Sequence, residues 1–228
     1  MTGRPYNPLE KANLAKSIEM ELLARAPVPL TGVSDAKGAG IYVIYYVGGF
    51  QAYEPIQSKN LNGAFAQPIY VGKAIPKGGR KGGLTADASK GRALADRLVQ
   101  HATSVEQASN LDADDFLVRH LVVDDIWIPL GENMLIETFK PLWNRAIDGF
   151  GNKDPGNRRA TQYRSPWDVL HPGRAFSTKL AESPLTIDFL ERRVSDYLAG
   201  RPLEKLPKVI EEQQAAELAE AEQVVDEV

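Results

Sequence analysis

GIYVIYYV (residues 40–47) and YVGKA (residues 70–74) are the two stretches of this chain that decide its fold. The first is a run of β-branched and aromatic residues that ends at Gly48 and Gly49, and the second overlaps a short apolar run over 68–71. The runs over 40–47 and 68–71 are typical of β-strands, so we expect two neighbouring strands joined by an elaborated hairpin loop. The tripeptides GIY and YVG within them are weak evidence of function when taken alone.

The chain on either side of these strands alternates helical and strand patterns. Apolar residues recur at helical spacing over 8–25, and Pro27 and Pro29 end that pattern. We also expect a helix over 92–102, a strand over 116–123, a helix over 132–140 that ends at Pro141, and a helix over 185–198. Residues 148–174 are expected to be mostly loop. Together these elements predict an α+β fold, with a small central antiparallel or mixed sheet flanked by helices.

The composition limits the class of protein. With 228 residues, of which 43% are hydrophobic, the chain can build one domain of ordinary size with appended segments. Its longest nearly apolar run, residues 40–50, is about half as long as a membrane span, and the first residues lack the layout of a signal peptide. We therefore expect a soluble, cytoplasmic protein. Because cysteine is absent, any metal must be bound by oxygen or imidazole.

Charge is distributed unevenly along the chain. The net charge is -3, which at first argues against a nucleic-acid partner, but residues 204–228 hold eight acidic and two basic residues. The rest of the chain is therefore positive. Its cations gather in residues 73–97, with seven basic and two acidic residues, and in residues 145–164, with five basic and two acidic residues. These two patches are candidate DNA-binding segments, whereas the acidic tail is expected to be helical or disordered.

Four polar residues follow the two strand motifs in order. Arg97 and His101 are spaced i and i+4, so they share one face of the expected helix. Glu132 follows on the next helix, and Asn144 comes twelve positions later. Arg97 and His101 could instead form an ordinary exposed helix pair. Glu137 lies on the same helix as Glu132 but points about 140° away from it, and the inward-packing face includes Glu132.

This series resembles the GIY-YIG nuclease core over roughly residues 38–146. YVGKA, the helix with Arg97 and His101, KPLWN (140–144), DGFGN (148–152) and WDVLHPGR (167–174) are further similar to the GIY-YIG type II restriction enzymes that cut the palindrome CCGCGG. The long separation of GIY from YVG and the glycine-rich basic insert depart from the wider superfamily but match this restriction branch. The resemblance implies a Mg²⁺-dependent DNA endonuclease that acts as a homodimer on double-stranded DNA, with a cognate DNA methyltransferase as its genetic partner.

The resemblance also divides the chain into parts. Residues 1–37 form an N-terminal helical extension, 38–147 the nuclease core with a basic insert at 76–91, 148–203 a segment of DNA-contacting loops and a helix, and 204–228 the acidic tail. The N-terminal helix is a candidate part of the dimer interface, because a palindromic site with one active site per chain implies two-fold symmetry.

Phosphodiester hydrolysis assigns a task to each residue of the series. A deprotonated water must attack, and the charge of the transition state must be neutralised. Tyr42 is the candidate proton acceptor, provided that nearby cations hold it partly ionised or that it passes its proton to His101. The planar fork of Arg97 suits phosphate oxygens. The remaining assignments are Lys73 as a second cation, Glu132 as the ligand of one Mg²⁺, and Tyr70 and Asn144 as hydrogen-bonding groups that position the phosphate and the site.

Sequence reading is assigned to cations outside this core. Arginine and lysine contact phosphates and guanine edges most often, and the two basic patches supply them. The candidates are Lys77, Arg80, Lys81, Lys90, Arg92, Lys153, Arg158, Arg159, Gln162 and Arg164. His120 and His171 are expected to be structural.

Two other functions remain open at this point. The first is a repair or mobile-element GIY-YIG nuclease, which would bring a second DNA-binding domain. The second is a non-catalytic DNA-binding module that uses the same basic patches. The intact polar series argues against the binding module.

Overall fold

The computed structural model describes residue 7 and residues 10–75, 89–154 and 161–216. Most of the predicted basic insert lies outside these residues, as does the end of the acidic tail. Of the predicted DNA contacts, Lys77, Arg80, Lys81, Arg158 and Arg159 lie outside the described residues.

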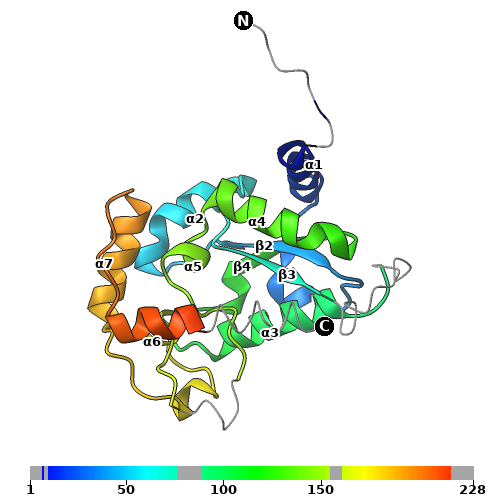
Figure 1. The fold of residues 1–228 in the computed structure, drawn as a ribbon. Helices are drawn as coiled ribbons and strands as arrows, with labels where there is room; N and C mark the ends of the chain where they lie inside the picture. The colour runs from blue at the N-terminus through cyan, green and yellow to red at the C-terminus, as the bar shows by residue number, and fades with distance from the viewer. Residues whose placement is uncertain (1–6, 8–9, 76–88, 155–160, 217–228) are drawn as a thin grey trace, which may run out of the picture.

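A four-stranded antiparallel sheet lies at the centre of the described chain, in the order β1-β4-β2-β3 (Figure 1). The strands are β1 (Val28–Pro29), β2 (Gly40–Tyr46), β3 (Tyr70–Ala74) and β4 (Phe116–Val122). Helices flank this sheet, so the predicted α+β fold is confirmed. β2 pairs on both sides, while β3 forms one edge of the sheet.

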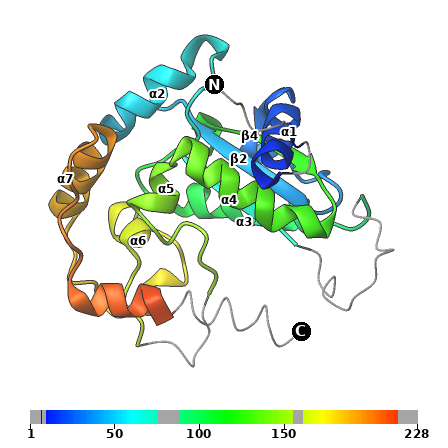
Figure 2. The same ribbon diagram turned by 45° about the horizontal axis from the view of Figure 1, so that its top comes forward.

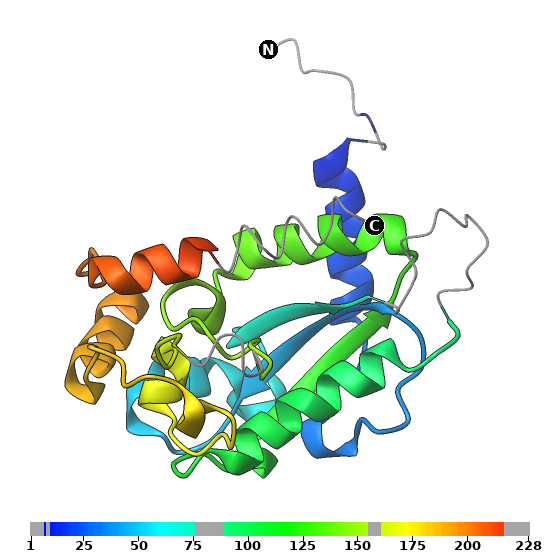
Figure 3. The same ribbon diagram turned by 60° about the horizontal axis from the view of Figure 1, so that its bottom comes forward.

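Helices cover both faces of the sheet, and alternate residues of β2 point into the two cores. Tyr42, Ile44 and Tyr46 belong to the core beneath α3 (Ala93–Gln107), whereas Ile41, Val43 and Tyr45 belong to the core beneath α4 (Ile128–Phe139). Figure 3 shows the strands between these two helices. Every residue of β2 is buried, as a strand packed on both faces requires.

The N-terminal helix α1 (Lys11–Leu23) lies on the α4 side of the sheet. Its apolar residues Ile18 and Leu22 pack with that core, and Gly131 of α4 allows the close approach, because a Cβ there would lie 3.1 Å from Ile41 and 3.2 Å from Ile18. The apolar face of the predicted N-terminal helix thus has a partner within its own chain.

The connection between β2 and β3 contains α2 (Glu54–Asn60), which agrees with the expected elaborated hairpin. Beyond β4 and α4 the chain forms α5 (Leu142–Arg145), α6 (Pro166–Leu170) and α7 (Ile187–Leu198). Figure 2 shows α7 beside α2, at the opposite end of the molecule from α1. The described parts of the predicted loop region, residues 148–154 and 161–174, are irregular apart from α6, close to the prediction. Among the described residues, no helix is both long and apolar enough to cross a bilayer.

The core beneath α3 contains a closed hydrogen-bonded group around Tyr53 and His171. The Tyr53 hydroxyl accepts a bond from Trp143 Nε1 at 2.9 Å and lies 2.5 Å from His171 Nε2. His171 Nδ1 lies 2.9 Å from Asn110 Oδ1, and Asn110 donates to the carbonyl of Leu170. Because Asn110 Oδ1 can only accept, His171 carries its proton on Nδ1, and its Nε2 accepts a hydrogen bond from the Tyr53 hydroxyl. Burial lowers the pKa of His171 to about 3, so it is neutral, as a structural histidine should be.

Candidate active site

Tyr42 and His101 meet in the core between β2 and α3. The Tyr42 hydroxyl lies 2.7 Å from His101 Nε2, although the two residues are far apart in the sequence. Tyr42 is directly opposite Gly72 in the β2–β3 register, and a Cβ on Gly72 would lie 2.4 Å from the Tyr42 hydroxyl. The glycine of the YVG motif therefore makes room for the tyrosine of the GIY motif.

The surroundings keep both groups of this pair neutral. Burial, and then the neighbouring Tyr70, raise the pKa of Tyr42 well above its ordinary value. Burial, and then the positive charges of Arg97, Arg174 and Lys153, lower the pKa of His101 well below its ordinary value. The first of the two expected ways of activating Tyr42, partial ionisation by nearby cations, is opposed by burial. The second, proton transfer to His101, has the required geometry.

Arg97 and Tyr70 form the layer above this pair. The Arg97 guanidinium lies beside the hydroxyls of both tyrosines, donates to Gln100 at 3.2 Å, and donates to the carbonyl of Gly151 at 2.8 Å. Tyr42 itself has no exposed surface, while Tyr70 is 9% exposed. Arg97 is thus the polar group between the buried pair and the solvent, and the alternative of an ordinary exposed helix pair does not hold, since His101 is only 1% exposed.

Lys73 and Glu132 belong to the other face of the sheet. Lys73 Nζ lies 2.6 Å from Glu132 Oε2, and the Glu132 side chain is 14% exposed. Because side chains alternate along β3, Lys73 points to the α4 face while Tyr70 points to the α3 face. β3 is an edge strand, so groups from both faces reach the same edge. Glu137, by contrast, is exposed and pairs with Arg145, which agrees with the predicted helix phase.

Asn144 lies along the free edge of β3. Its side-chain Oδ1 accepts a bond from the Val71 amide at 2.8 Å, and its Nδ2 donates to the Val71 carbonyl at 2.9 Å. Next to it, the Trp143 amide donates to the Ile69 carbonyl at 3.0 Å. The side chain therefore replaces the neighbouring strand that an edge residue lacks, and it fixes the position of β3.

A groove of about 970 Å³ is lined by those groups of the site that reach the surface. Its lining includes Tyr70, Arg97 and Glu132, together with further polar side chains. The charged residues that line it are Lys73, Lys90, Arg92, Arg97, Lys153, Asp96 and Glu132, five cations against two carboxylates. Such an excess of positive charge suits a polyanion.

The predicted DNA contacts within the described chain divide between two environments. Lys90, Arg92 and Lys153 line the groove, where Arg92 also pairs with Asp96 and donates to the Ser34 carbonyl. Gln162 lies away from it and lines a smaller cavity of about 290 Å³ that shares Lys153 with the groove. Arg164 donates to the Ser177 carbonyl.

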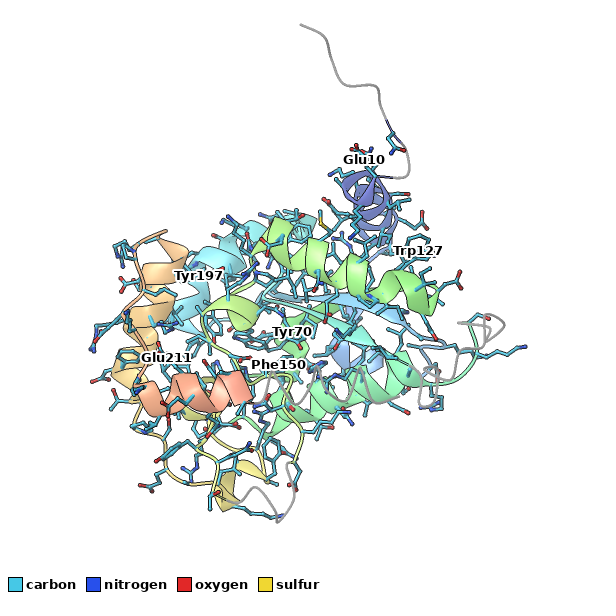
Figure 4. All side chains as sticks on the ribbon, viewed as in Figure 1. Glu10, Tyr70, Trp127, Phe150, Tyr197 and Glu211 are labelled. Carbon is cyan, nitrogen blue, oxygen red and sulfur yellow. The ribbon has the colours of Figure 1, made fainter. Side chains whose placement is uncertain are left out.

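Sequence reasoning missed that the loop over 148–152 contacts the site, and it missed the residues that hold this loop. Phe150 stacks on His101 with ring centroids 4.4 Å apart, and it contacts Tyr70 at 5.0 Å (Figure 4). Asp168 and Arg174, both buried, form an ion pair beneath the loop. The DGFGN and WDVLHPGR motifs contain these residues, but charged residues in an irregular segment give no pattern that predicts burial.

A metal ion would depend mainly on Glu132. The described residues contain no group of three or more histidine or acidic side chains that could hold a metal. A single partly exposed carboxylate at a groove suits Mg²⁺, which commonly keeps several waters and substrate oxygens as its other ligands. Lys73 now neutralises this carboxylate, so a metal would share or displace that contact.

Comparison with known protein families gives one assignment. A family model described as the Eco29kI GIY-YIG domain matches residues 34–198, which is well over half of the chain. The match begins before β2, ends with α7, and includes every residue of the site described above. No curated protein sequence matches the chain.

Proposed function

Since the chain belongs to the restriction endonuclease family of the Eco29kI GIY-YIG domain and is thus a DNA endonuclease, we propose that it is a type II enzyme that cuts both strands of a palindromic site. In this proposal two chains act as a homodimer, Mg²⁺ is the cofactor, and the site is CCGCGG. The enzyme works in the cytoplasm beside a methyltransferase that protects the same sequence. The observation that carries the chemistry is the buried bond between Tyr42 and neutral His101.

Tyr42 is the general base through His101. The phenol accepts a proton from the attacking water while its own proton passes to His101 Nε2, 2.7 Å away. No free phenolate forms before attack, which the raised pKa of Tyr42 makes costly. The low pKa of His101 keeps the imidazole unprotonated before the reaction, and the same low pKa makes its protonated form costly, so His101 holds the proton only during the attack.

Arg97 binds the scissile phosphate. Its bond to the Gly151 carbonyl anchors the guanidinium, while the N–H groups beside Tyr42 and Tyr70 turn to the phosphate oxygens. This exchange of partners uncovers the Tyr42 hydroxyl when substrate arrives. A guanidinium aimed at the developing charge is the kind of contact whose loss slows the chemical step rather than binding.

Glu132 and Lys73 act on the opposite side of the phosphate. Glu132 would hold Mg²⁺, which when bound neutralises charge on the phosphate and on the leaving oxygen. Lys73, 2.6 Å from Glu132, holds the carboxylate in place before the metal binds and adds positive charge at the groove afterwards. Asn144 keeps β3, and with it Tyr70 and Lys73, in position.

A plasmid with a single CCGCGG sequence tests the proposal. We expect Mg²⁺ to convert the supercoiled form to one linear product, and we expect no cutting in EDTA or on a matched plasmid in which the site is changed by one base pair. Cutting at a different sequence would refute the specificity alone. Nicking only at branches or lesions would favour a repair nuclease, and DNA binding without cleavage under any divalent metal would favour a binding module.

A further inference from the structure

Asp168 and Arg174 form a buried ion pair just outside the nuclease core. The guanidinium contacts both carboxylate oxygens, with Nε 2.7 Å from Oδ1 and Nη2 2.8 Å from Oδ2. Each side chain is 1% exposed. Ser165 donates to the same carboxylate at 2.6 Å, and the guanidinium lies over the Trp167 and Phe176 rings at 4.5 and 4.7 Å. The geometry is that of a rigid, bidentate pair.

The remaining donors of Arg174 bind the backbone of the loop over 148–152. Nη2 donates to the Gly149 carbonyl at 2.8 Å, and Nη1 donates to the Phe150 carbonyl at 3.1 Å. Gly149 has a φ of +110°, and a Cβ there would lie 2.1 Å from the Ser165 hydroxyl. The loop is thus held tightly against the segment that carries Asp168. We call Asp168, Arg174 and the two carbonyls the clasp.

The upper side of the same loop touches the active site. The Gly151 carbonyl accepts the bond from Arg97, and the Phe150 ring stacks on His101. A Cβ on Gly151 would lie 2.8 Å from the Tyr70 hydroxyl and 3.2 Å from Arg97 Nη2. One short loop therefore joins the clasp to Arg97, His101 and Tyr70, with little freedom to shift.

Stability alone gives a poor reason for this arrangement. Burying two charges costs several kcal/mol per ion before their attraction repays it, and well-packed apolar residues often stabilise a core as well or better. The ion pair supplies fixed hydrogen-bond donors for the carbonyls of Gly149 and Phe150. An apolar pair could not do so. That role is needed where the loop position matters.

We propose that Asp168 and Arg174 are positioning residues of the nuclease, which hold the loop over 149–151 so that the Gly151 carbonyl aims Arg97 at the scissile phosphate. The proposal rests on the proposed function for the identity of the reaction, but the geometry of the clasp does not depend on it. It predicts that damage to the clasp slows the chemical step and leaves DNA binding intact.

The test compares clasp variants with a matched core variant. Arg174→Lys keeps the charge but loses the fork, and Asp168→Asn weakens the pair from the other side. Each should lower the single-turnover cleavage rate about 10- to 100-fold, with DNA affinity in EDTA within about 3-fold of wild type. Tyr53→Phe is the control, because it disrupts a buried hydrogen-bonded group that does not bind the loop; it should lower the melting temperature and leave the rate within about 3-fold.

Two further measurements separate positioning from stability. In an Arg97→Lys background, the added Arg174→Lys change should lower the rate by less than about 3-fold, because the group through which it acts is already altered. Gly151→Ala should reproduce the loss of rate with the clasp intact. The proposal would be overturned if the rate of the double variant fell by the product of the two single-variant losses. It would also be overturned if the rate fell in step with the melting temperature in every variant, Tyr53→Phe included.

Hydrogen exchange supplies a readout without turnover. Amides of residues 149–152 should exchange at least about 10-fold faster in Asp168→Asn, while those of β2 exchange at the wild-type rate. If the wild-type protein cuts no DNA but this local change is found, the proposed function fails and the structural part of the clasp holds. If wild type cuts and exchange rises equally everywhere, the clasp is an ordinary stabilising pair and our inference is wrong.

Discussion

Acidification from pH 7 to pH 5 should destabilise this protein through two buried histidines. Burial lowers the folded-state pKa of His101 and of His171, while both have an ordinary pKa of 6.5 in the unfolded chain. Below pH 6.5 the unfolded chain therefore binds protons that the folded chain does not. Stability rises with pH wherever the unfolded state binds more protons, so this contribution is complete above about pH 6.5 and is lost as the pH falls below it.

The size of the effect follows from the same linkage. With its folded pKa at about 3, the His171 ring is not protonated in the fold at pH 5. His171 then removes about 2 kcal/mol from the free energy of unfolding between pH 7 and pH 5. Burial lowers the folded pKa of His101 too, so His101 adds to the loss in the same direction. The loss from His171 alone is a sizeable part of the stability of an ordinary domain.

Urea unfolding at the two pH values measures this difference. His171→Gln should be less stable than wild type at pH 7 but should lose about 2 kcal/mol less on acidification, and His101→Gln should change in the same direction. The half-buried His120 is present in every variant, so its contribution to the pH dependence of stability cancels when variants are compared. In the same range the wild-type cleavage rate should show no step with a pKa near 6.5 until the protein unfolds. Such a step in a folded enzyme, or an unchanged pH dependence in His101→Gln, would refute the neutral buried pair with Tyr42.

Three further changes test the site. Tyr42→Phe should leave DNA affinity intact and lower single-turnover cleavage by about 10²- to 10⁴-fold, because only the proton-accepting oxygen is removed; a wild-type rate would exclude Tyr42 as the base. Glu132→Gln should abolish Mg²⁺-dependent cleavage while Glu137→Gln is nearly silent, as followed by Mg²⁺ titration, and the reverse order would place the metal elsewhere. Gly72→Ala should cost about 1–3 kcal/mol and slow cleavage, because its Cβ would displace the Tyr42 hydroxyl, whereas Gly49→Ala, with open space around it, should do neither in the same melting and rate assays.

The resemblance to the GIY-YIG core selected the candidate site residues, and regular helix spacing predicted which of their side chains share a face. Arg97 and His101 share a helix face through the i, i+4 spacing, and Glu132 lies on the packed face of its helix. The pairing of Tyr42 with Gly72 could not be predicted, since the long connection between β2 and β3 hides the register. That register explains why β3 extends to Ala74, beyond the expected end at residue 71.

Other differences have local causes. α4 begins at Ile128 rather than at Glu132, because Pro129 is tolerated in the first turn of a helix. The clasp was missed because Asp168 and Arg174 are charged residues in a segment without periodicity, where exposure is the ordinary expectation. Only the packing of α6 against the loop over 148–152 makes their burial favourable.

The closed group around Tyr53 and His171 gives this protein an internal reference for spectroscopy. It joins the same two atoms, a tyrosine hydroxyl and a histidine Nε2, as the pair of Tyr42 and His101 does. The pair of Tyr53 and His171 is enclosed in the core, where His171 also contacts Asn110. The pair of Tyr42 and His101 lies beneath Arg97, which lines the groove. Imidazole nitrogen resonances should therefore give two signals from similar chemistry in one sample. If a titration with metal or DNA moves the His101 signal and leaves the His171 signal in place, the change reports on the groove. Effects of salt, temperature or folding would move both signals.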